Sequence, residues 1–147
     1  MERRDMFKNI FAAALGVVGV SSAARAASAS QRVRVVYHLS DLDKVAFVLG
    51  NIRNHIAGVG GPDKIDVKLV VHGPALRAFH IASADKRVLD GAAKLIAEGV
   101  GMAACGNTMK AQKIALSGLP SGFDVAEKGG VVRLTELQMD GYHYLRP

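Results

Sequence analysis

After residue 30, short apolar segments alternate with amphipathic stretches. Residues 33–39, VRVVYHL, are rich in β-branched side chains, which is typical of a strand. In the stretch that follows, 40–56, apolar side chains recur every three or four residues, and this period predicts a helix. The apolar positions of this predicted helix are Leu42, Val45, Leu49, Ile52 and Ile56.

The same alternation continues through residue 147. We predict strands at 33–39, 64–73, 100–105, 123–125 and 142–145, and helices at 40–56, 84–99, 108–116 and 130–142. The segment 130–142 is ambiguous, but Val131, Leu134 and Leu137 recur every three residues, which favours a helix. Strands that alternate with helices predict an α/β domain, in which a mostly parallel sheet of about five strands is covered on both faces.

Three helix ends carry local signals. Ser40 and Asp43 have the spacing of a capping box at the start of the first helix. Asn107 precedes the helix at 108–116 and is a residue type that caps helices. Gly99 suits the left-handed position that follows the helix at 84–99.

Residues 1–29 have the three parts of a secretory signal peptide. A basic start is followed by an apolar run at 10–20, and small residues then offer cleavage sites after Ala26 or Ala29. The apolar run is shorter than the roughly 20 residues that a membrane-spanning helix needs. We therefore expect a signal peptide at 1–29, a domain at 30–147, a periplasmic location and no stable membrane span after processing. Arg3 and Arg4 lie one residue off the usual twin-arginine spacing, so the twin-arginine and general secretory routes both remain open.

The charge of the processed chain is mildly positive. Removal of 1–26 lowers Lys+Arg from 19 to 15 and Asp+Glu from 13 to 11, so the formal net charge falls from +6 to +4. Proteins that bind nucleic acid usually cluster basic residues among aromatic ones. Here the basic residues are scattered, aromatic residues make up 5% and Trp is absent, which argues against nucleic acid as a partner.

Cys105 is the only cysteine, so the chain cannot form an internal disulfide. A single cysteine in an exported protein indicates either a pairing with another molecule or a free reactive thiol. The alternative is an inert buried cysteine that packs as a small hydrophobic side chain.

The predicted strands bring three reactive residues to one edge of the sheet. His38, His72 and Cys105 end the first, second and third strands, and ligands of parallel sheets bind at the carboxyl ends of strands. Cys105 also precedes a helix, whose free N–H groups favour the thiolate. We take Cys105 as the candidate catalytic residue, with His38, His72, Asn107 and Arg77 as candidate binding residues.

Each of these interpretations has a simpler alternative. His38 and His72 are also typical of histidines that bond loop backbones, and Arg77 of a solvated residue. We expect surface or packing roles for His55 and His143. A metal site of Cys105, His38 and His72 lacks a close-spaced ligand pair and a fourth ligand, and a Cys-His hydrolase lacks an orienting group. The sequence predicts no metal and no cofactor.

Four segments, in order along the chain, carry a family resemblance. They are VVYHLSD…DKVAFVLGNIRNHI (35–41 and 43–56), VKLVVHGPALRAF (67–79), GVGMAACGNTMKA (99–111) and GGVVRLTELQMDGYHYLRP (129–147). Together they resemble the DsrE/DsrF-like family of sulfur-relay proteins, which has the YchN-like fold, and in particular its exported single-domain members. The resemblance covers roughly residues 33–147.

The resemblance implies a three-layer α/β/α sandwich that assembles into homo-oligomers, as trimers or hexamers. Better-studied members carry sulfur as a persulfide on a cysteine, and Cys105 stands at a matching position. Those members act in cytoplasmic sulfur oxidation or tRNA thiolation, so the export signal of this chain puts both pathways in doubt.

Three hypotheses for the function follow. The first is a sulfur carrier or transferase, in which Cys105 takes up a sulfane sulfur and passes it to a partner protein or a small thiol, while His38 or His72 bonds the thiolate or moves a proton. The second is a non-catalytic oligomeric module that binds a small ligand or metal at the same edge. The third is a structural oligomer with a silent thiol.

Overall fold

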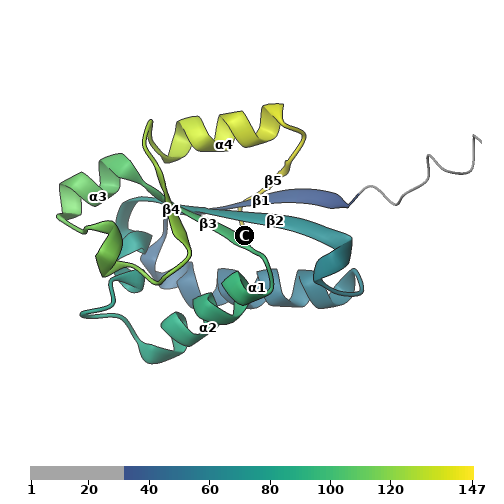
Figure 1. The fold of residues 1–147 in the computed structure, drawn as a ribbon, viewed down its shortest axis with the longest axis horizontal. Helices are drawn as coiled ribbons and strands as arrows, with labels where there is room; N and C mark the ends of the chain where they lie inside the picture. The colour runs from purple at the N-terminus through teal and green to yellow at the C-terminus, as the bar shows by residue number, and fades with distance from the viewer. Residues whose placement is uncertain (1–31) are drawn as a thin grey trace, which may run out of the picture. The chain divides into compact units, whose positions relative to one another are not determined.

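The computed structural model of the protein describes residues 32–147 (Figure 1). The strands are β1 (Val33–Leu39), β2 (Ile65–Val71), β3 (Gly101–Cys105), β4 (Phe123–Ala126) and β5 (His143–Leu145). The α-helices are α1 (Val45–Gly58), α2 (Lys86–Ala97), α3 (Gly106–Gln112) and α4 (Gly130–Met139). Short 3-10 segments are η1 (Leu42–Lys44), η2 (Pro62–Lys64), η3 (Gly73–Phe79) and η4 (Leu116–Gly118). Each predicted strand and helix is present.

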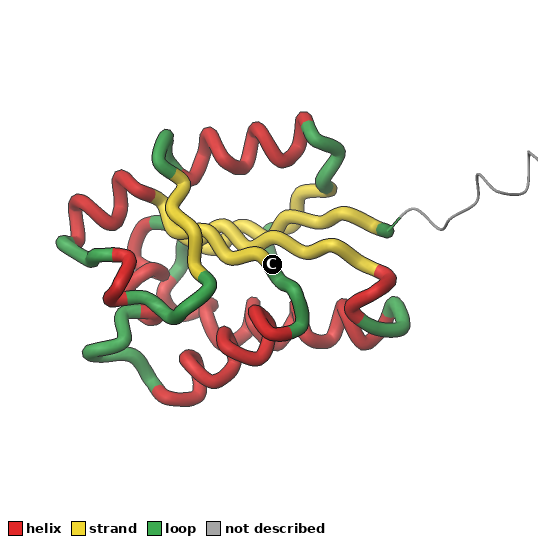
Figure 2. Tube along the Cα trace, in the orientation of Figure 1, coloured by secondary structure: helices red, strands yellow, loops and turns green. Residues whose placement is uncertain are grey.

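The five strands form one sheet in the order β4-β3-β2-β1-β5, and every pair is parallel (Figure 2). The chain moves outward from β1 through β2 and β3 to β4, and then returns to place β5 on the other side of β1. The direction of strand addition therefore reverses between β1 and β5. Ligands of open α/β sheets bind at such a reversal, outside the carboxyl ends of the strands.

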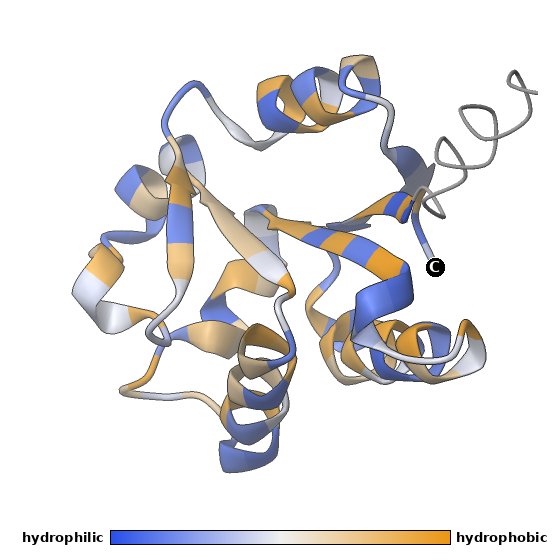
Figure 3. Ribbon diagram, turned by 45° about the vertical axis from the view of Figure 1, so that its right-hand side comes forward, coloured by the Kyte–Doolittle hydropathy of each residue, from blue (hydrophilic) through white to orange (hydrophobic). Residues whose placement is uncertain are grey.

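Helices cover both faces of the sheet, as predicted, but unequally. Helices α1 and α2 lie below the sheet in Figure 1 and α4 lies above it. The lower layer closes the larger core, which includes Ile52, Leu69 and Phe79, all fully buried. The upper core is small and contains five buried residues, Val36, Val70, Leu134, Leu137 and Tyr142. Figure 3 shows hydrophobic and hydrophilic residues on each helix, as expected for helices between a core and solvent.

Two predicted helix caps are wrong. Ser40 does not cap the first helix: its hydroxyl donates to Asp41 Oδ1 at 3.3 Å, and the chain enters α1 through the 3-10 turn η1 without a capping side chain. Asn107 lies inside α3, because that helix begins directly at the end of β3 with Cys105 at the N-cap. Gly106, the first residue of α3, packs closely on the end of β4, since a Cβ there would stand 3.1 Å from the backbone oxygen of Ala126.

Other boundaries differ in ways that local contacts explain. Helix α3 ends at Gln112, short of the predicted residue 116, because Lys113 takes a left-handed conformation with φ 55°. The segment after β2 forms the 3-10 helix η3, which the sequence pattern did not reveal. Gly99 follows α2 with φ +93°, so this predicted helix end is confirmed.

The predicted signal peptide and its cleavage sites lie outside the described residues. Within residues 32–147, none of the helices has the length and apolar character needed to cross a membrane.

Candidate functional site

The ends of β1 and β2 bring His38 and His72 together on the α4 side of the sheet. Val36 and Val70 lie in the core beneath α4, and side chains two residues apart on a strand share a face. The backbone of His72 is still extended, and its N–H donates to Leu39 O at 3.0 Å. The two imidazoles are nearly parallel, with ring centroids 4.7 Å apart and an interplanar angle of 18°.

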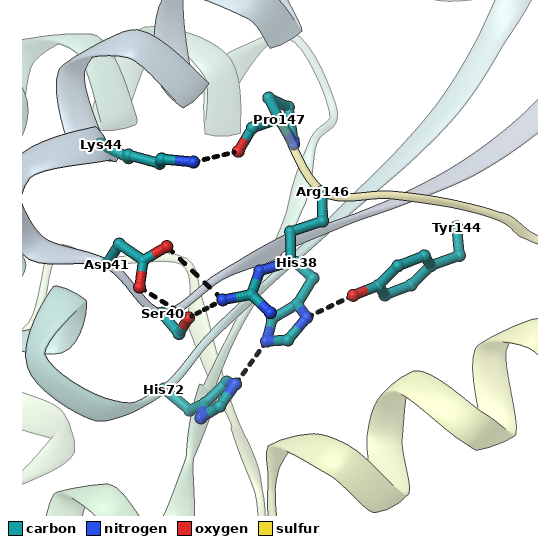
Figure 4. A network of polar contacts seen from close by, with 8 residues as sticks. All are labelled: His38, Ser40, Asp41, Lys44, His72, Tyr144, Arg146 and Pro147. Carbon is teal, nitrogen blue, oxygen red and sulfur yellow. Dashed lines mark hydrogen bonds and ion pairs between the residues drawn. The ribbon is translucent and has the colours of Figure 1, made fainter.

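The two histidines are joined to Tyr144 in one chain of hydrogen bonds. Nε2 of His38 bonds Nε2 of His72, and Nδ1 of His38 bonds the Tyr144 hydroxyl at 2.6 Å (Figure 4). Because a hydrogen bond between two imidazole nitrogens holds one proton, one Nε2 donates and the other accepts.

Nearby charges and burial keep this pair neutral. Burial lowers the pKa of His38, and the neighbouring His72 and Arg146 lower it further, against an opposing effect of Asp41. Burial and Arg146 also lower the pKa of His72, again opposed by Asp41. A neutral imidazole pair at neutral pH can accept a proton from a bound molecule.

Residues beside β5 complete this edge of the site. Nη2 of Arg146 donates to Ser40 Oγ at 3.1 Å and lies 3.5 Å from Asp41 Oδ2 (Figure 4). Lys44 Nζ donates to the Pro147 oxygen at 3.2 Å. The segment 144–147 thus lies across the ends of β1 and η1.

The site residues Tyr144, Arg146, Ser40 and Asp41 were not predicted. The last predicted strand carried the signal that would have found two of them. Placed beside β1 as a parallel strand, it brings Tyr144 and Arg146 to the same carboxyl edge as His38. The sequence pattern predicted the strand at 142–145 but did not show that it pairs with β1.

Cys105 lies beneath the first residue of α4. The thiol-bearing residue is 6% exposed. A Cβ built on Gly130 would stand 3.3 Å from the Cβ of Cys105 and 3.3 Å from the Cβ of His72. Gly130 therefore packs against both residues at once, at the point where the neighbouring strands β2 and β3 end.

Donors from two helices act on the Cys105 thiol. Burial by itself raises the pKa of this thiol, but the Thr108 hydroxyl and the N–H groups of Thr108, Gly130 and Asn107, which lie near the sulfur, lower it by more. The net pKa of Cys105 lies below its ordinary value. The thiol makes no capping hydrogen bond of ordinary geometry to α3, so these donors act on the sulfur as nearby dipoles.

Thr108 is held in place from the other side. Its Oγ1 accepts the Gly73 N–H at 3.0 Å, and Gln112 Nε2 donates to Gly73 O at 2.8 Å. Because the lone pair of Oγ1 receives the Gly73 N–H, the Thr108 hydroxyl proton is free to be donated to Cys105. Thr108 is a site residue that the sequence did not single out.

The other predicted residues lie apart from the histidine pair. Asn107 is exposed, and its Nδ2 lies beside Gly129, where a Cβ would meet it at 2.9 Å. Arg77 is exposed on η3, and its guanidinium forms no hydrogen bond or ion pair with residues 32–147. His55 bonds the Tyr37 hydroxyl at 2.9 Å from α1, and His143 is exposed on β5.

The arrangement suits nucleophilic chemistry at sulfur. A thiol with a lowered pKa attacks electrophilic sulfur or carbon as the thiolate. In the described part of the chain, no group of three or more His, Cys, Asp or Glu side chains is placed to hold a metal ion.

Comparison with known proteins gives structural relatives only. No protein-family model matches the chain, and no curated protein has a significant sequence match. Protein MTH1491 of Methanobacterium thermoautotrophicum, a protein of unknown function, is 26% identical and superposes with a TM-score of 0.68. The alignment covers 78% of this chain and 99% of that chain.

Two further solved structures share the fold at lower identity. The YchN protein of E. coli is 12% identical with a TM-score of 0.56, over 78% of this chain and 99% of its own. Protein BT1422 of Bacteroides thetaiotaomicron, also of unknown function, is 18% identical with a TM-score of 0.58, over 78% of this chain and 95% of its own. The described part of this chain therefore has the DsrE/DsrF-like fold of YchN.

Proposed function

We propose that the protein carries sulfane sulfur as a persulfide on Cys105 and relays it to a partner thiol. The observation that carries this proposal is the setting of Cys105, a thiol whose pKa is lowered by Thr108 and by N–H groups of α3 and α4. The DsrE/DsrF-like fold agrees with a sulfur-relay protein.

The proposed transfer needs no external oxidant. The Cys105 thiolate attacks the outer sulfur of a donor persulfide, R–S–SH. A new S–S bond forms to Cys105, the S–S bond of the donor breaks, and its electron pair leaves with the donor as the thiolate R–S⁻. The acceptor thiolate then attacks the outer sulfur on Cys105 in the same way and regenerates the Cys105 thiolate.

The surrounding residues have separate roles in this proposal. The donors that stabilise the thiolate also stabilise an ionised persulfide on Cys105. In this proposal the neutral His38–His72 pair hydrogen-bonds the Cys105 sulfur or passes its proton on to solvent, and the shared contact of His72 and Cys105 with Gly130 supports this role. Tyr144 fixes the ring of His38 through Nδ1.

The setting of the protein is also part of the proposal. We place it in the periplasm as a homo-oligomer, with a protein or a small thiol as its sulfur donor and acceptor. Cell fractionation tests the location, and light scattering of the purified chain tests the assembly.

Intact-mass spectrometry tests the central claim. After incubation with inorganic polysulfide we expect a gain of one sulfur atom that dithiothreitol removes. The Cys105→Ser variant should gain none, and Cys105 should be the modified residue in peptide mapping. Absence of an adduct on the folded wild-type protein would overturn the proposal.

A further inference from the structure

A polar groove runs along the sheet beside the proposed sulfur site. It lies between α4 and the edge strand β4 and has a cavity volume of about 370 Å³. Cavities that hold small molecules measure about 300–1,000 Å³, so the groove has the size for one. Gly101 and Ala103 of β3 form its floor.

The end of the groove at the carboxyl ends of the strands lies beside Cys105. Ala126, which lines the groove, is the register partner of Cys105 in the β3–β4 pair. Neighbouring strands are about 4.8 Å apart, so a ligand at this end lies one strand away from the cysteine. Gly129 also lines the groove and precedes Gly130, the residue that packs on Cys105.

The walls of the groove carry both signs of charge. Arg133 and Lys128 lie on the α4 side, where they share Glu136 at 3.5 and 3.6 Å. Lys68 lies over the floor at Gly101 and forms an ion pair with Asp66 at 3.3 Å.

Two exposed carboxylates lie on the opposite wall. Asp124 of β4 and Glu127, which follows it, line the groove. Neither forms a side-chain hydrogen bond or ion pair with any residue in the described range 32–147. A molecule lying on this floor therefore meets cations on one side and free carboxylates on the other.

From this arrangement we infer that the groove binds a small zwitterionic thiol of peptide size, which delivers or receives the sulfur at Cys105. Its carboxylates bind Arg133 and Lys68, its ammonium group binds Asp124, and its sulfur lies at the Gly129 end. This inference rests on the proposed function and names the class of its small-molecule partner. In the transfer step, the persulfide of this thiol is the donor R–S–SH and the free thiolate is the product.

Binding is tested with a thiol analogue that cannot react. We use S-methylglutathione, a thioether with two carboxylates and one ammonium group, with the full chain in calorimetry. Arg133→Ala and Asp124→Asn should each weaken binding by about tenfold, as expected for a lost charge-assisted hydrogen bond. The matched controls Arg87→Ala and Asp90→Asn, both on α2 at the other face of the sheet, should bind as the wild type does.

A third variant fills the floor without changing charge. Ala103→Leu should abolish binding of S-methylglutathione, because the added side chain occupies the groove. Its circular dichroism spectrum shows whether the fold is kept. If this variant does not fold, the two charge variants test the inference without it.

Transfer kinetics separate this inference from the proposed function. We compare sulfur uptake by Cys105 from glutathione persulfide with uptake from inorganic polysulfide, which needs no zwitterion site. Arg133→Ala and Asp124→Asn should slow only the reaction with glutathione persulfide. Equal slowing with both donors, or no binding of S-methylglutathione by the wild type, would overturn the inference that the groove binds a zwitterionic thiol. If the wild type binds the thioether but takes no sulfur from polysulfide, the result would support ligand binding in the groove and overturn the proposed function.

Discussion

At the scale of residues, the candidate site consists of a thiol and a histidine pair that share Gly130 as a neighbour. The pKa of Cys105 is set by opposing effects, since burial favours the thiol and the surrounding donors favour the thiolate. Among those donors only the Thr108 hydroxyl is a side chain, so it is the one that mutation can remove alone. This makes Thr108 the position at which the activation of Cys105 can be measured.

Thr108→Ala should raise the pKa of Cys105, because it removes a donor that stabilises the thiolate. At pH 7 the thiolate fraction should fall about three- to tenfold, the size expected for the loss of an interaction worth about 0.6–1.4 kcal/mol. Above both pKa values the variant should alkylate at least as fast as the wild type, because a thiolate of higher pKa is the stronger nucleophile. The measurement is the iodoacetamide rate at Cys105 as a function of pH.

Thr108→Ser is the matched control because it keeps the hydroxyl. Its profile should follow the wild type. If the serine and alanine variants shift the inflection equally, the hydroxyl does not activate Cys105.

At the scale of elements, α4 closes the upper core and starts over the site. Its first residue must be small, since a Cβ on Gly130 would stand 3.3 Å from both Cys105 and His72. Such a contact is too tight for ordinary packing, so a neighbouring side chain or α4 itself must move. The same helix therefore links the stability of the upper core to the geometry around the thiol.

Gly130→Ala should lower the free energy of unfolding by about 1–2 kcal/mol through overpacking. It should also change the rate of Cys105 alkylation, because the displaced N–H of residue 130 acts on the thiol. Urea denaturation and the alkylation assay check the two effects.

Gly50→Ala, in the middle of α1, is the control. A Cβ there meets only Arg53 Nη2, at 3.8 Å, so alanine should stabilise the protein by about 0.5–1 kcal/mol. Stabilisation of the Gly130→Ala variant would show that α4 has room above Cys105.

At the scale of the whole molecule, the site extends from the end of β3, at Cys105, to the boundary of β1 and β5, where the order of strand addition reverses. Strands β1 and β2 lie inside the sheet, and most of their residues are buried. Strand β5 is a three-residue edge strand, and each of its residues is exposed. Tyr144 and Arg146 therefore belong to the least buried part of the sheet. We therefore expect the side of the site at His72 and Cys105 to be rigid and the side at Tyr144 and Arg146 to open more readily.

Amide hydrogen exchange should show this division. The amides of β1 and β2 should exchange only with global unfolding, while those of β5 exchange by local opening, orders of magnitude faster. Exchange measured by NMR on the native protein tests this. Protection of β5 equal to that of β1 would mean that the 143–147 segment is as fixed as the core.

The predictions from sequence succeeded where one local pattern decides the structure. The run at 33–39 and the three- and four-residue spacing after it produced the observed β1 and α1, because hydrophobic period reports which side of an element is buried. The predicted caps at Ser40 and Asn107 were wrong, because hydrophobic period does not show the residue at which a helix begins. A cap depends on where the backbone turns, and here the chain enters α1 through the 3-10 turn η1 and enters α3 directly from β3.

The chain by itself determined an α/β sheet with covered faces and the placement of His38, His72 and Cys105 at strand ends, since both follow from local periodicity and parallel pairing. Only the tertiary structure decided which side chains meet. The His38–His72 bond spans 34 residues and the His38–Tyr144 bond spans 106, and the chain between them carries no local signal of either contact. The placement of Gly130 over Cys105 likewise depends on how α4 packs on the sheet, which is settled by the sum of distant contacts.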